Sequence, residues 1–439
     1  MRNTQSKFVG LLAILAIVCA AEKSLARSLD LLNAIEVALE NSPSYKSARL
    51  SVDLAQKEVL NARAAYFPSL DFSAEQGVEQ DPLDDSSTSR ADLFSSLNLG
   101  LTEQLYDNGR QQIRSNLAAL KYKTAELEFR RIKEEIVLRI SGAYLDYSLA
   151  VRTLDAEREQ AKLLETQVRT TSSRYRQGLT RETDFLLIQA QQRRADVAVL
   201  AAEQKLKTTR LDLIEILGIP KDLIESDAIQ LIVLPLDAVN VSVPSKPVYE
   251  STWPYLEADL AIQISDAEVD LVKAESGLRI EATAGGEYVL QNYLRDSSTP
   301  AVEDGFGWKA LLVLKANLWD WGTRRRNVEI ATGEKRITEY RYQTEQLAVL
   351  SELEQLMLEV RIGNELLKAA RDLLHIQNRA TQMVQNDYRV GRTKYLDLVT
   401  SVSDLTRAQI GVAAQSSSLL RSIYRFRYLH GDLYESLRH

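Results

Sequence analysis

The chain is built from two similar halves. The first half contains LYDNGR and the second contains LWDWGTR, and each joins an alternating apolar stretch to a long charged stretch. Asp107 and Asp320 have the same separation along the chain as Gly109 and Gly322. A spacing that is kept in this way indicates that one structural unit is used twice in tandem.

Other segments keep the same spacing or nearly so. YRQGLTRETDFL matches YRVGRTKYLDLV, and the separation of Gly178 from Gly391 equals that of the two aspartates. Nearer the start of each half, Pro43 and Pro254 have almost the same separation. A fold that is proposed for one half therefore has to fit both.

Each half opens with helical sequence, at 29–65 and at 254–278. The first stretch is interrupted at Asn41-Ser42-Pro43, where serine suits an N-cap and proline suits the first turn of a new helix. Ser28 is a candidate cap for the helix that precedes this break. We expect two helices at the start of the first half and one helix, opened by Pro254, at the start of the second.

Four segments alternate between apolar and polar residues, which is the pattern of strands with one apolar face. The alternation runs over about ten residues, the length of strands in a membrane barrel. Polar loops at 79–92 and 295–305 separate the strands of each pair and suit the outer, solvent-exposed end of such a barrel. The segments are SLDFSAEQGV, SLNLGLTEQL, RIEATAGGEYVLQNYL and GFGWKALLVLKANLW. The residues expected to face lipid include Leu99, Leu101, Leu312 and Leu314.

Two long helical hairpins follow the strand pairs. Residues 110–174 contain no proline, and their apolar residues recur at three- and four-residue steps, as in a coiled coil. A helix of this length would extend ~100 Å. The first hairpin turns at Gly178 and returns to about residue 217, and the second turns at Gly391 and returns to about residue 429.

The repeated motif, LYDNGR in the first half and LWDWGTR in the second, marks the place where a strand becomes a helix. Glycine permits unusual backbone angles at such a place, and aspartate can cap the N-terminus of the new helix. We therefore assign a structural role to Asp107, Gly109, Asp320 and Gly322 at the two strand-to-helix transitions.

The composition provides little for catalysis. A net charge of −7 and a pI near 5.4 do not favour binding of nucleic acid. The three histidines have no partner at metal-ligand spacing, and the single cysteine, Cys19, lies close to the N-terminus. There is no P-loop, nucleophile elbow or dinucleotide fingerprint. We expect no enzyme, no cofactor and no metal site.

The N-terminus is typical of an exported protein. A basic start, an apolar run and small residues before Ala26 form a secretory signal peptide over residues 1–26. The first repeat then spans 27–217 and the second spans 254–430. A linker, or equatorial segment, at 218–253 joins them, and 431–439 form a C-terminal tail.

Together these features resemble the TolC-type outer-membrane efflux and secretion channels, known as outer membrane factors. The resemblance rests on LDLLNAIEVALENSPSYKSAR, ARAAYFPSL, LTEQLYDNGR and YRQGLTRETDFLLIQAQ, which occur in this order. It implies a mainly α fold with a small β part, in which three chains form an α-barrel of hairpins and a twelve-stranded transmembrane β-barrel. Some oligomer is required in any case, because four strands cannot close a barrel and lipid does not tolerate open strand edges.

The resemblance also implies a closed periplasmic gate at the helical turns. Asp397 matches the gate aspartate of the family and Tyr388 matches its gate tyrosine. Thr183 and Asp184 match the corresponding pair in the first hairpin. Capping or solvation near a turn is the alternative role for the two aspartates.

The chain departs from the family pattern at two gate positions. Thr400 stands where a second aspartate is expected, one turn after Asp397. Thr393 stands where a bridging arginine is expected, and its neighbours are Arg392 and Lys394. Different bonds are therefore expected to hold the closed gate, with Arg392 among the candidate residues.

The implied function is passive conduction of substrates across the periplasm and the outer membrane of a Gram-negative bacterium, for a tripartite efflux pump or a type I secretion system. The implied partners are two further copies of the chain, a periplasmic adaptor that docks at Gly178, Leu179 and Gly391, an inner-membrane ABC or RND transporter, and outer-membrane lipid, but no nucleic acid. The alternative is a periplasmic adaptor or coiled-coil scaffold of an export complex. An adaptor would have one hairpin, whereas this chain has two.

Overall fold

The computed structural model describes residues 27–79, 92–219, 229–233, 248–292 and 302–438. The predicted signal peptide and most of the two polar loops lie outside these ranges. The chain forms two compact units, and each takes residues from both repeats. Unit 1 contains residues 1–48, 129–255 and 347–439, and unit 2 contains 49–128 and 256–346.

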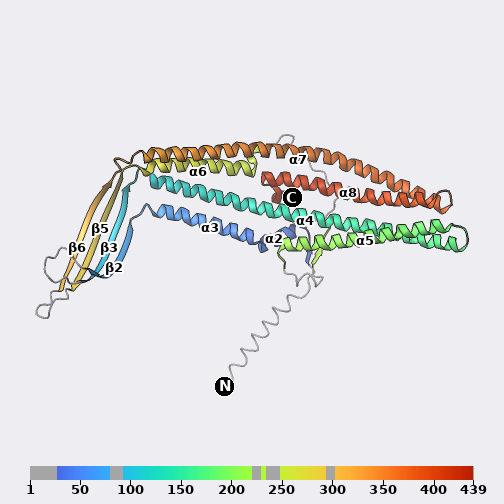
Figure 1. The fold of residues 1–439 in the computed structure, drawn as a ribbon, viewed down its shortest axis with the longest axis horizontal. Helices are drawn as coiled ribbons and strands as arrows, with labels where there is room; N and C mark the ends of the chain where they lie inside the picture. The colour runs from blue at the N-terminus through green and yellow to red at the C-terminus, as the bar shows by residue number, and fades with distance from the viewer. Residues whose placement is uncertain (1–26, 80–91, 220–228, 234–247, 293–301, 439) are drawn as a thin grey trace, which may run out of the picture. The chain divides into compact units, whose positions relative to one another are not determined.

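Unit 2 contains an antiparallel sheet of four strands in the order β2-β3-β5-β6 (Figure 1). The four strands that alternation predicts are confirmed, and within the sheet the two halves meet where β3 pairs with β5. In this register Leu99 lies between Phe72 of β2 and Gly286 of β5. The strands are β2 (Ser69–Glu79), β3 (Asp92–Tyr106), β5 (Arg279–Asn292) and β6 (Val302–Lys315).

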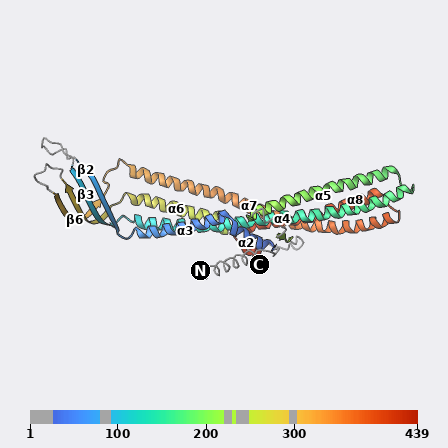
Figure 2. The ribbon, with the colours of Figure 1, turned by 90° about the horizontal axis from the view of Figure 1, so that it is seen from below.

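Neighbouring helices of unit 2 contact one another in chain order. They comprise most of α3 (Pro43–Ala64), the first part of α4 (Arg110–Arg176), most of α6 (Trp253–Glu275) and the first part of α7 (Thr323–Arg389) (Figure 2). The side chain of Gln111 on α4 donates to the carbonyl of Ala62 on α3. Leu117 and Leu120 of α4 pack on Ala267 of α6 in a small apolar core.

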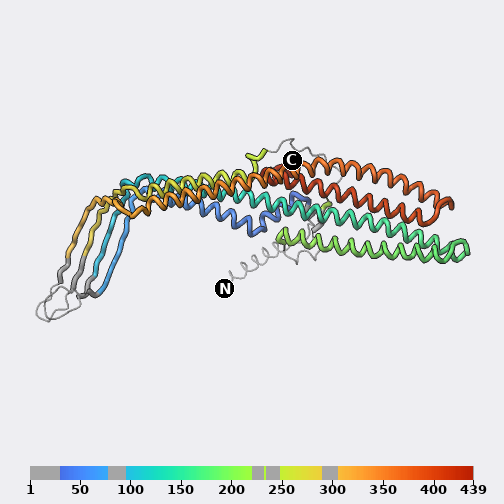
Figure 3. Tube along the Cα trace, turned by 45° about the horizontal axis from the view of Figure 1, so that its top comes forward, coloured from blue at the N-terminus to red at the C-terminus, as the bar shows by residue number. Residues whose placement is uncertain are grey.

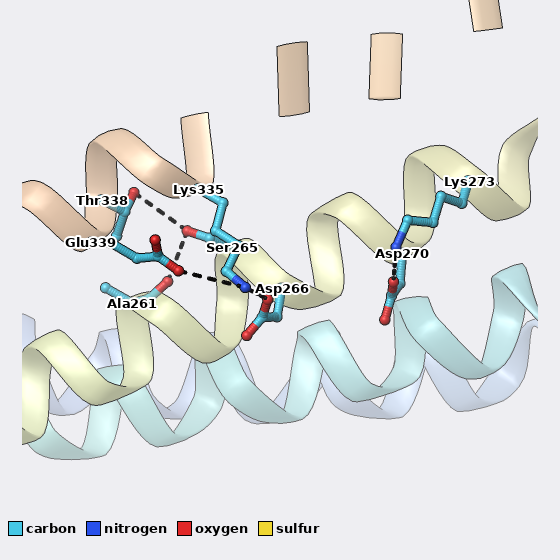
Figure 4. Close-up of polar contacts among 8 residues, drawn as sticks. All are labelled: Ala261, Ser265, Asp266, Asp270, Lys273, Lys335, Thr338 and Glu339. Carbon is cyan, nitrogen blue, oxygen red and sulfur yellow. Dashed lines mark hydrogen bonds and ion pairs between the residues drawn. The ribbon is translucent and has the colours of Figure 1, made fainter. Parts of the chain in front are cut away.

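Polar contacts join α6 to α7 (Figure 4). Lys335 of α7 forms an ion pair with Asp266 of α6, and the hydroxyls of Ser265 and Thr338 lie 3.4 Å apart. Water and salt screen exposed charges, so pairs of this kind contribute little to the stability of unit 2.

Unit 1 contains two helical hairpins, which confirms the prediction from periodicity (Figure 3). α4 returns through α5 (Glu182–Leu217), and α7 returns through α8 (Tyr395–His430). Completely buried side chains include Ile140, Tyr144, Leu145, Leu213, Leu217 and Leu353. Among the described residues, no helix combines the length and the apolar character that crossing a membrane would need.

The start of the first half contains two helices, as the sequence predicts, but with a different first cap. α2 (Leu31–Asn41) is capped by Asp30, whose carboxylate accepts from the Asn33 amide at 2.9 Å. The prediction of Ser28 as this cap is wrong, because Ser28 lies in the short strand β1 (Arg27–Leu29). Ser42 caps α3 as predicted and accepts from the Tyr45 amide at 3.3 Å. The pairing of β1 with β4 (Ile229–Leu231) was not expected from the sequence.

The C-terminal residues pack within unit 1. The chain turns at Gly431 into the short helix α9 (Leu433–Arg438), and the Leu433 side chain is fully buried. The buried carboxylate of Glu134 accepts a hydrogen bond from the Tyr434 amide at 3.0 Å. Burial raises the pKa of the Glu134 carboxyl, since the charged form loses water.

A close approach of Asn108 requires glycine at position 277. The side-chain amide of Asn108 donates to the backbone carbonyl of Ala274 at 3.2 Å, and a Cβ at Gly277 would lie within 2.5 Å of the Asn108 side chain. We predict that Gly277→Ala displaces Asn108 and destabilises the protein by about 1–3 kcal/mol. Thermal unfolding of the purified protein measures this loss.

Gly333→Ala is the matched control for this prediction. Gly333 lies inside α7 with no atom within 4 Å of an added Cβ. This substitution should stabilise the helix by about 0.5–1 kcal/mol, because alanine has the higher helix propensity. Equal stability changes in the two variants would contradict the close-approach account.

Candidate functional site at the helical turns

The two hairpins turn in the same way. The Gly178 and Gly391 backbones have φ of 71° and 78°, in the left-handed region. The Leu179 amide donates to the Arg174 carbonyl at 2.9 Å, and the Arg392 amide donates to the Asp387 carbonyl at 2.8 Å. Each glycine amide also donates three residues back, which completes a Schellman motif at both turns. The repeat therefore extends to individual hydrogen bonds.

The residues below the turns differ between the hairpins. In the first hairpin, Tyr175 stacks on Phe185 with ring centroids 5.3 Å apart. In the second, Tyr388 is buried against Leu398 and Val402. The guanidinium of Arg174 lies 5.8 Å from the centre of the Tyr388 ring, so this tyrosine also contacts the first hairpin. In this conformation Tyr388 is a packing residue between hairpins.

Asp397 lies in the first turn of α8 and accepts two hydrogen bonds. The Thr393 hydroxyl donates to its carboxylate at 2.9 Å, and the Lys394 amide donates to it at 3.3 Å. Thr393, which replaces the bridging arginine expected from the family, thus binds Asp397 directly. The carboxylate remains exposed, so it can act both as a cap and as a surface charge.

Asp184 occupies the matching turn of α5 and is half-buried. It lies close to Tyr395 of the second hairpin. Burial raises the pKa of the Tyr395 hydroxyl, and the negative charge of Asp184 raises it further. Thr183 precedes Asp184 on α5, and Arg392 follows the second turn, both exposed. The fold therefore brings the turn of the first hairpin close to the start of α8.

The two hairpins share an apolar cluster next to these groups. Leu164 of α4, Ala195 of α5 and Val399 of α8 are buried together, and Tyr395 packs against them. The Gln160 side chain on α4 donates to the Ser403 hydroxyl on α8 at 3.2 Å. Any separation of the hairpins must break these contacts.

Apolar side chains are exposed around the turns. Leu179 is 72% exposed at the first turn and Val390 is 64% exposed at the second. Exposed leucines continue onto α5 and α8 at Leu186, Leu187 and Leu396. Exposed apolar side chains at the ends of the hairpins are available for contact with another protein.

The strand-to-helix transitions are formed by repeated hydrogen bonds in unit 2. The Asp107 carboxylate accepts from the amides of Gly109 at 3.0 Å and Gln111 at 2.5 Å. The Asp320 carboxylate accepts from the amides of Gly322 at 3.0 Å and Arg324 at 2.7 Å. Gly109 and Gly322 have φ of 82° and 81°. Both aspartates therefore act as helix caps, and no ligand is needed to explain them.

One face of the sheet is apolar and exposed. Leu99, Leu101, Leu312 and Leu314 point to this face, together with Leu70, Phe72, Leu97, Phe306 and Trp308. Charged residues such as Asp71, Glu75, Lys309 and Lys315 occupy the alternate positions of the outer strands. A large exposed apolar face on a sheet is suited to contact with lipid.

A buried polar pair in the second hairpin was not predicted from the sequence. The Ser401 hydroxyl donates to the Thr381 hydroxyl at 2.8 Å, and the Thr381 hydroxyl donates to the Ser401 carbonyl at 3.1 Å. A signal was available, since both residues lie equally far from Gly391 and so face each other across the turn. The equivalent residues of the first hairpin, Val168 and Ile188, are apolar.

A sheet with an apolar outer face, joined to paired long hairpins, defines the fold of an outer-membrane channel protein. The structure is similar to the CmeC outer membrane channel of Campylobacter jejuni, with a TM-score of 0.77 and 13% identity over 92% of this chain and 86% of that one. It is also similar to the open state of the Neisseria gonorrhoeae MtrE outer membrane channel, with a TM-score of 0.73 and 17% identity over 91% of this chain and 88% of that one.

The chain belongs to the outer membrane efflux protein family, whose model matches residues 34–219 and 256–431. Outer membrane protein OprJ of Pseudomonas aeruginosa is 24% identical over 432 residues, which cover 89% of this chain and 84% of OprJ. The protein is therefore a TolC-like channel protein of the Gram-negative outer membrane.

We predict that the buried pair in the second hairpin behaves as a unit. Thr381→Val leaves the buried Ser401 hydroxyl without its acceptor and should destabilise the protein by about 1–3 kcal/mol. Adding Ser401→Ala should restore part of this loss, because the double variant resembles the apolar pair of the first hairpin. Thermal unfolding of the single and double variants measures the coupling. Losses that simply add would show that the two hydroxyls are energetically independent.

Proposed function

We propose that three copies of this chain form a channel that conducts exported substrates passively across the periplasm and the outer membrane. The observation that carries the proposal is the sheet of unit 2, which has an apolar exposed face and two outer strands without a partner among the described residues. In lipid, the backbone groups of such strands must be paired, and a closed barrel is the arrangement that pairs them all. Three copies supply twelve strands.

The hairpins of unit 1 form the periplasmic entrance in this proposal. The Schellman turns at Gly178 and Gly391, with exposed Leu179 and Val390, provide an apolar surface for a periplasmic adaptor. The adaptor in turn connects the channel to an inner-membrane ABC or RND transporter, which supplies the energy. An adaptor or scaffold role for this chain itself has less support, because the family match covers both repeats.

Rings of aspartate control the entrance in this proposal. Three copies of Asp397, and three of Asp184, would surround the narrow end of the tube. Like charges held near one another attract cations and discourage anions. The hydrogen bond from Thr393 fixes the Asp397 carboxylate, so the ring is held by contacts within each chain. Opening then requires loss of the contacts that Leu164 and Tyr395 make between hairpins.

We predict that Asp397→Asn weakens cation selectivity and relieves block by divalent cations in single-channel recordings. Asparagine keeps an acceptor oxygen for the Thr393 hydroxyl, so the turn should remain intact while the ring loses its charge. The double variant with Asp184→Asn should show the larger effect.

Asp270→Asn is the matched control, because it removes the same charge from α6 and the ion pair with Lys273 is exposed. Selectivity that is unchanged in the double variant, or changed equally in the control, would rule out a gate at these residues.

A second prediction concerns insertion into the membrane. Leu312 lies on the apolar face of β6, so Leu312→Arg should disfavour insertion by about 2–4 kcal/mol if the residue lies near the bilayer midplane. Val313→Arg, on the opposite face of the same strand, is the control and should be tolerated. The fraction of protein in heat-resistant, membrane-embedded form measures both. Equal tolerance of arginine at the two positions would contradict the lipid-facing assignment.

A further inference from the structure

In the sheet, the two halves of the repeat pair through one strand of each half, and the equivalent strand pairing is not formed within the chain. β3 of the first half pairs with β5 of the second. The equivalent contact would join β6, at the end of the second half, to β2, at the start of the first. These are the two outer strands of the sheet, on opposite sides (Figure 1). The contact can therefore form only between two copies.

We propose that β6 and α7 of one copy bind β2 and α3 of the next copy in the register that the repeat dictates, with Leu312 opposite Gln76 and Lys315 opposite Ser73. This inference rests on the proposed assembly of three copies and adds the residues that join them.

The register follows from the pairs within the chain. Ala74 lies opposite Leu97 in the first half, and Ala284 lies opposite Ala310 in the second. Leu97 and Ala310 are equivalent positions, because their separation in sequence is the same as that of the repeated aspartates at the strand-to-helix transitions. Their partners Ala74 and Ala284 are therefore equivalent as well.

Leu99 lies opposite Gly286 in the pairing of β3 with β5. Moving two residues along each strand from these positions shows that Leu99 corresponds to Leu312 and that Gln76 corresponds to Gly286. Replacing each residue by its equivalent therefore places Leu312 opposite Gln76. In the same way, the pair of Thr102 with Thr283 becomes the pair of Lys315 with Ser73.

This register matches the faces and the charges of the two strands. It places Leu314 beside Ala74, on the apolar face, and Lys315 beside Ser73, on the polar face. Asp71 and Glu75 flank Ser73 on that face, so Lys315 would lie between two carboxylates of the next copy. A shift by one residue would place apolar side chains on the polar face. Opposite charges on neighbouring strands stabilise the pairing.

The helices also form one of two equivalent contacts within the chain and leave the residues of the other exposed. Leu117 of α4 is 7% exposed and packs with Leu271 in the apolar core formed with α6. At the spacing of the repeated aspartates, Leu117 corresponds to Ile330 on α7, and at the spacing of Pro43 and Pro254, Leu271 corresponds to Leu60 on α3. Both Ile330 and Leu60 are 59% exposed. The repeat therefore predicts that Ile330 of one copy covers Leu60 of the next.

The residues at the junction between strand and helix differ in type between the contact within the chain and the contact between copies. Within the chain, Asn108 fits against Gly277. The equivalents at the contact between copies are Trp321 and, at the same spacing as Pro43 and Pro254, Tyr66. Trp321 is 81% exposed and has φ of 56°, close to the 59° of Asn108. A large aromatic pair would thus replace the small polar pair, and aromatic rings contribute strongly to contacts between proteins.

Disulfide cross-linking in the membrane tests the register. The only cysteine of the sequence, Cys19, lies in the predicted signal peptide, so introduced cysteines report alone. Leu312→Cys with Gln76→Cys in one chain, and Leu314→Cys with Ala74→Cys in another, should yield covalent trimers on mild oxidation. Leu312→Cys with Phe72→Cys, shifted along the same face of β2, should yield several-fold less.

A charge exchange provides an independent test. Lys315→Glu should reduce the amount of heat-resistant trimer, and Glu75→Lys in the same chain should restore it. Within one chain β2 and β6 are separated by two strands, or roughly 14 Å, so rescue would require contact between copies. Glu281→Lys is the control, since Glu281 pairs with Lys315 inside the chain at 3.3 Å and rescue there would indicate an internal effect.

The outcomes distinguish this inference from the proposed function. Trimers that cross-link only through the shifted pair, or that are rescued only by Glu281→Lys, would overturn the register while leaving the assembly intact. Protein that forms no trimer with the original residues at all positions would overturn the assembly itself.

Discussion

The backbone hydrogen bonds of the outer strands are the constraint on which the rest of the structure depends. β2 and β6 each leave a row of amide and carbonyl groups without a partner in the described sheet. The apolar face beside them, with Leu312 and Trp308, belongs in lipid, where no water can satisfy those groups. In the proposed assembly, closure with further copies of the chain would resolve this conflict, and the internal repeat would allow it because each half presents the same elements in the same order.

The two halves have closely similar backbone conformations at matching positions but different side chains. Both turns are Schellman motifs and both transitions are capped by aspartate, with nearly equal φ at the matching glycines. The contacts above this framework differ. Val168 and Ile188 face each other in one hairpin, where Thr381 and Ser401 bond in the other. Asn108 is matched by Trp321. The proposed ring of similar elements would therefore contain two chemically distinct contacts, one within the chain and one between copies.

Periodicity predicted the parts of the fold that depend on patterns along the chain. The hairpins and the four strands follow from apolar spacing over many residues, and the turns follow from Gly178 and Gly391. Contacts that depend on how side chains meet in space were less accessible. Asp30 caps α2 in place of Ser28, because Ser28 lies in β1 and pairs with Gln230 of β4. The bond from Thr393 to Asp397 and the burial of Tyr388 beside Arg174 depend on side-chain geometry at the turns, which spacing alone does not specify.

Counting the chains in the assembly tests the central claim most directly. Native mass spectrometry of the protein released from outer membranes in detergent gives the number of copies without a label or a substitution. Closure of a barrel by four strands from each chain, with equivalent contacts throughout, predicts a single species of three mature chains. A single-chain species, or a two-chain species that resists dissociation, would contradict the account, because neither supplies the twelve strands that the closed barrel requires.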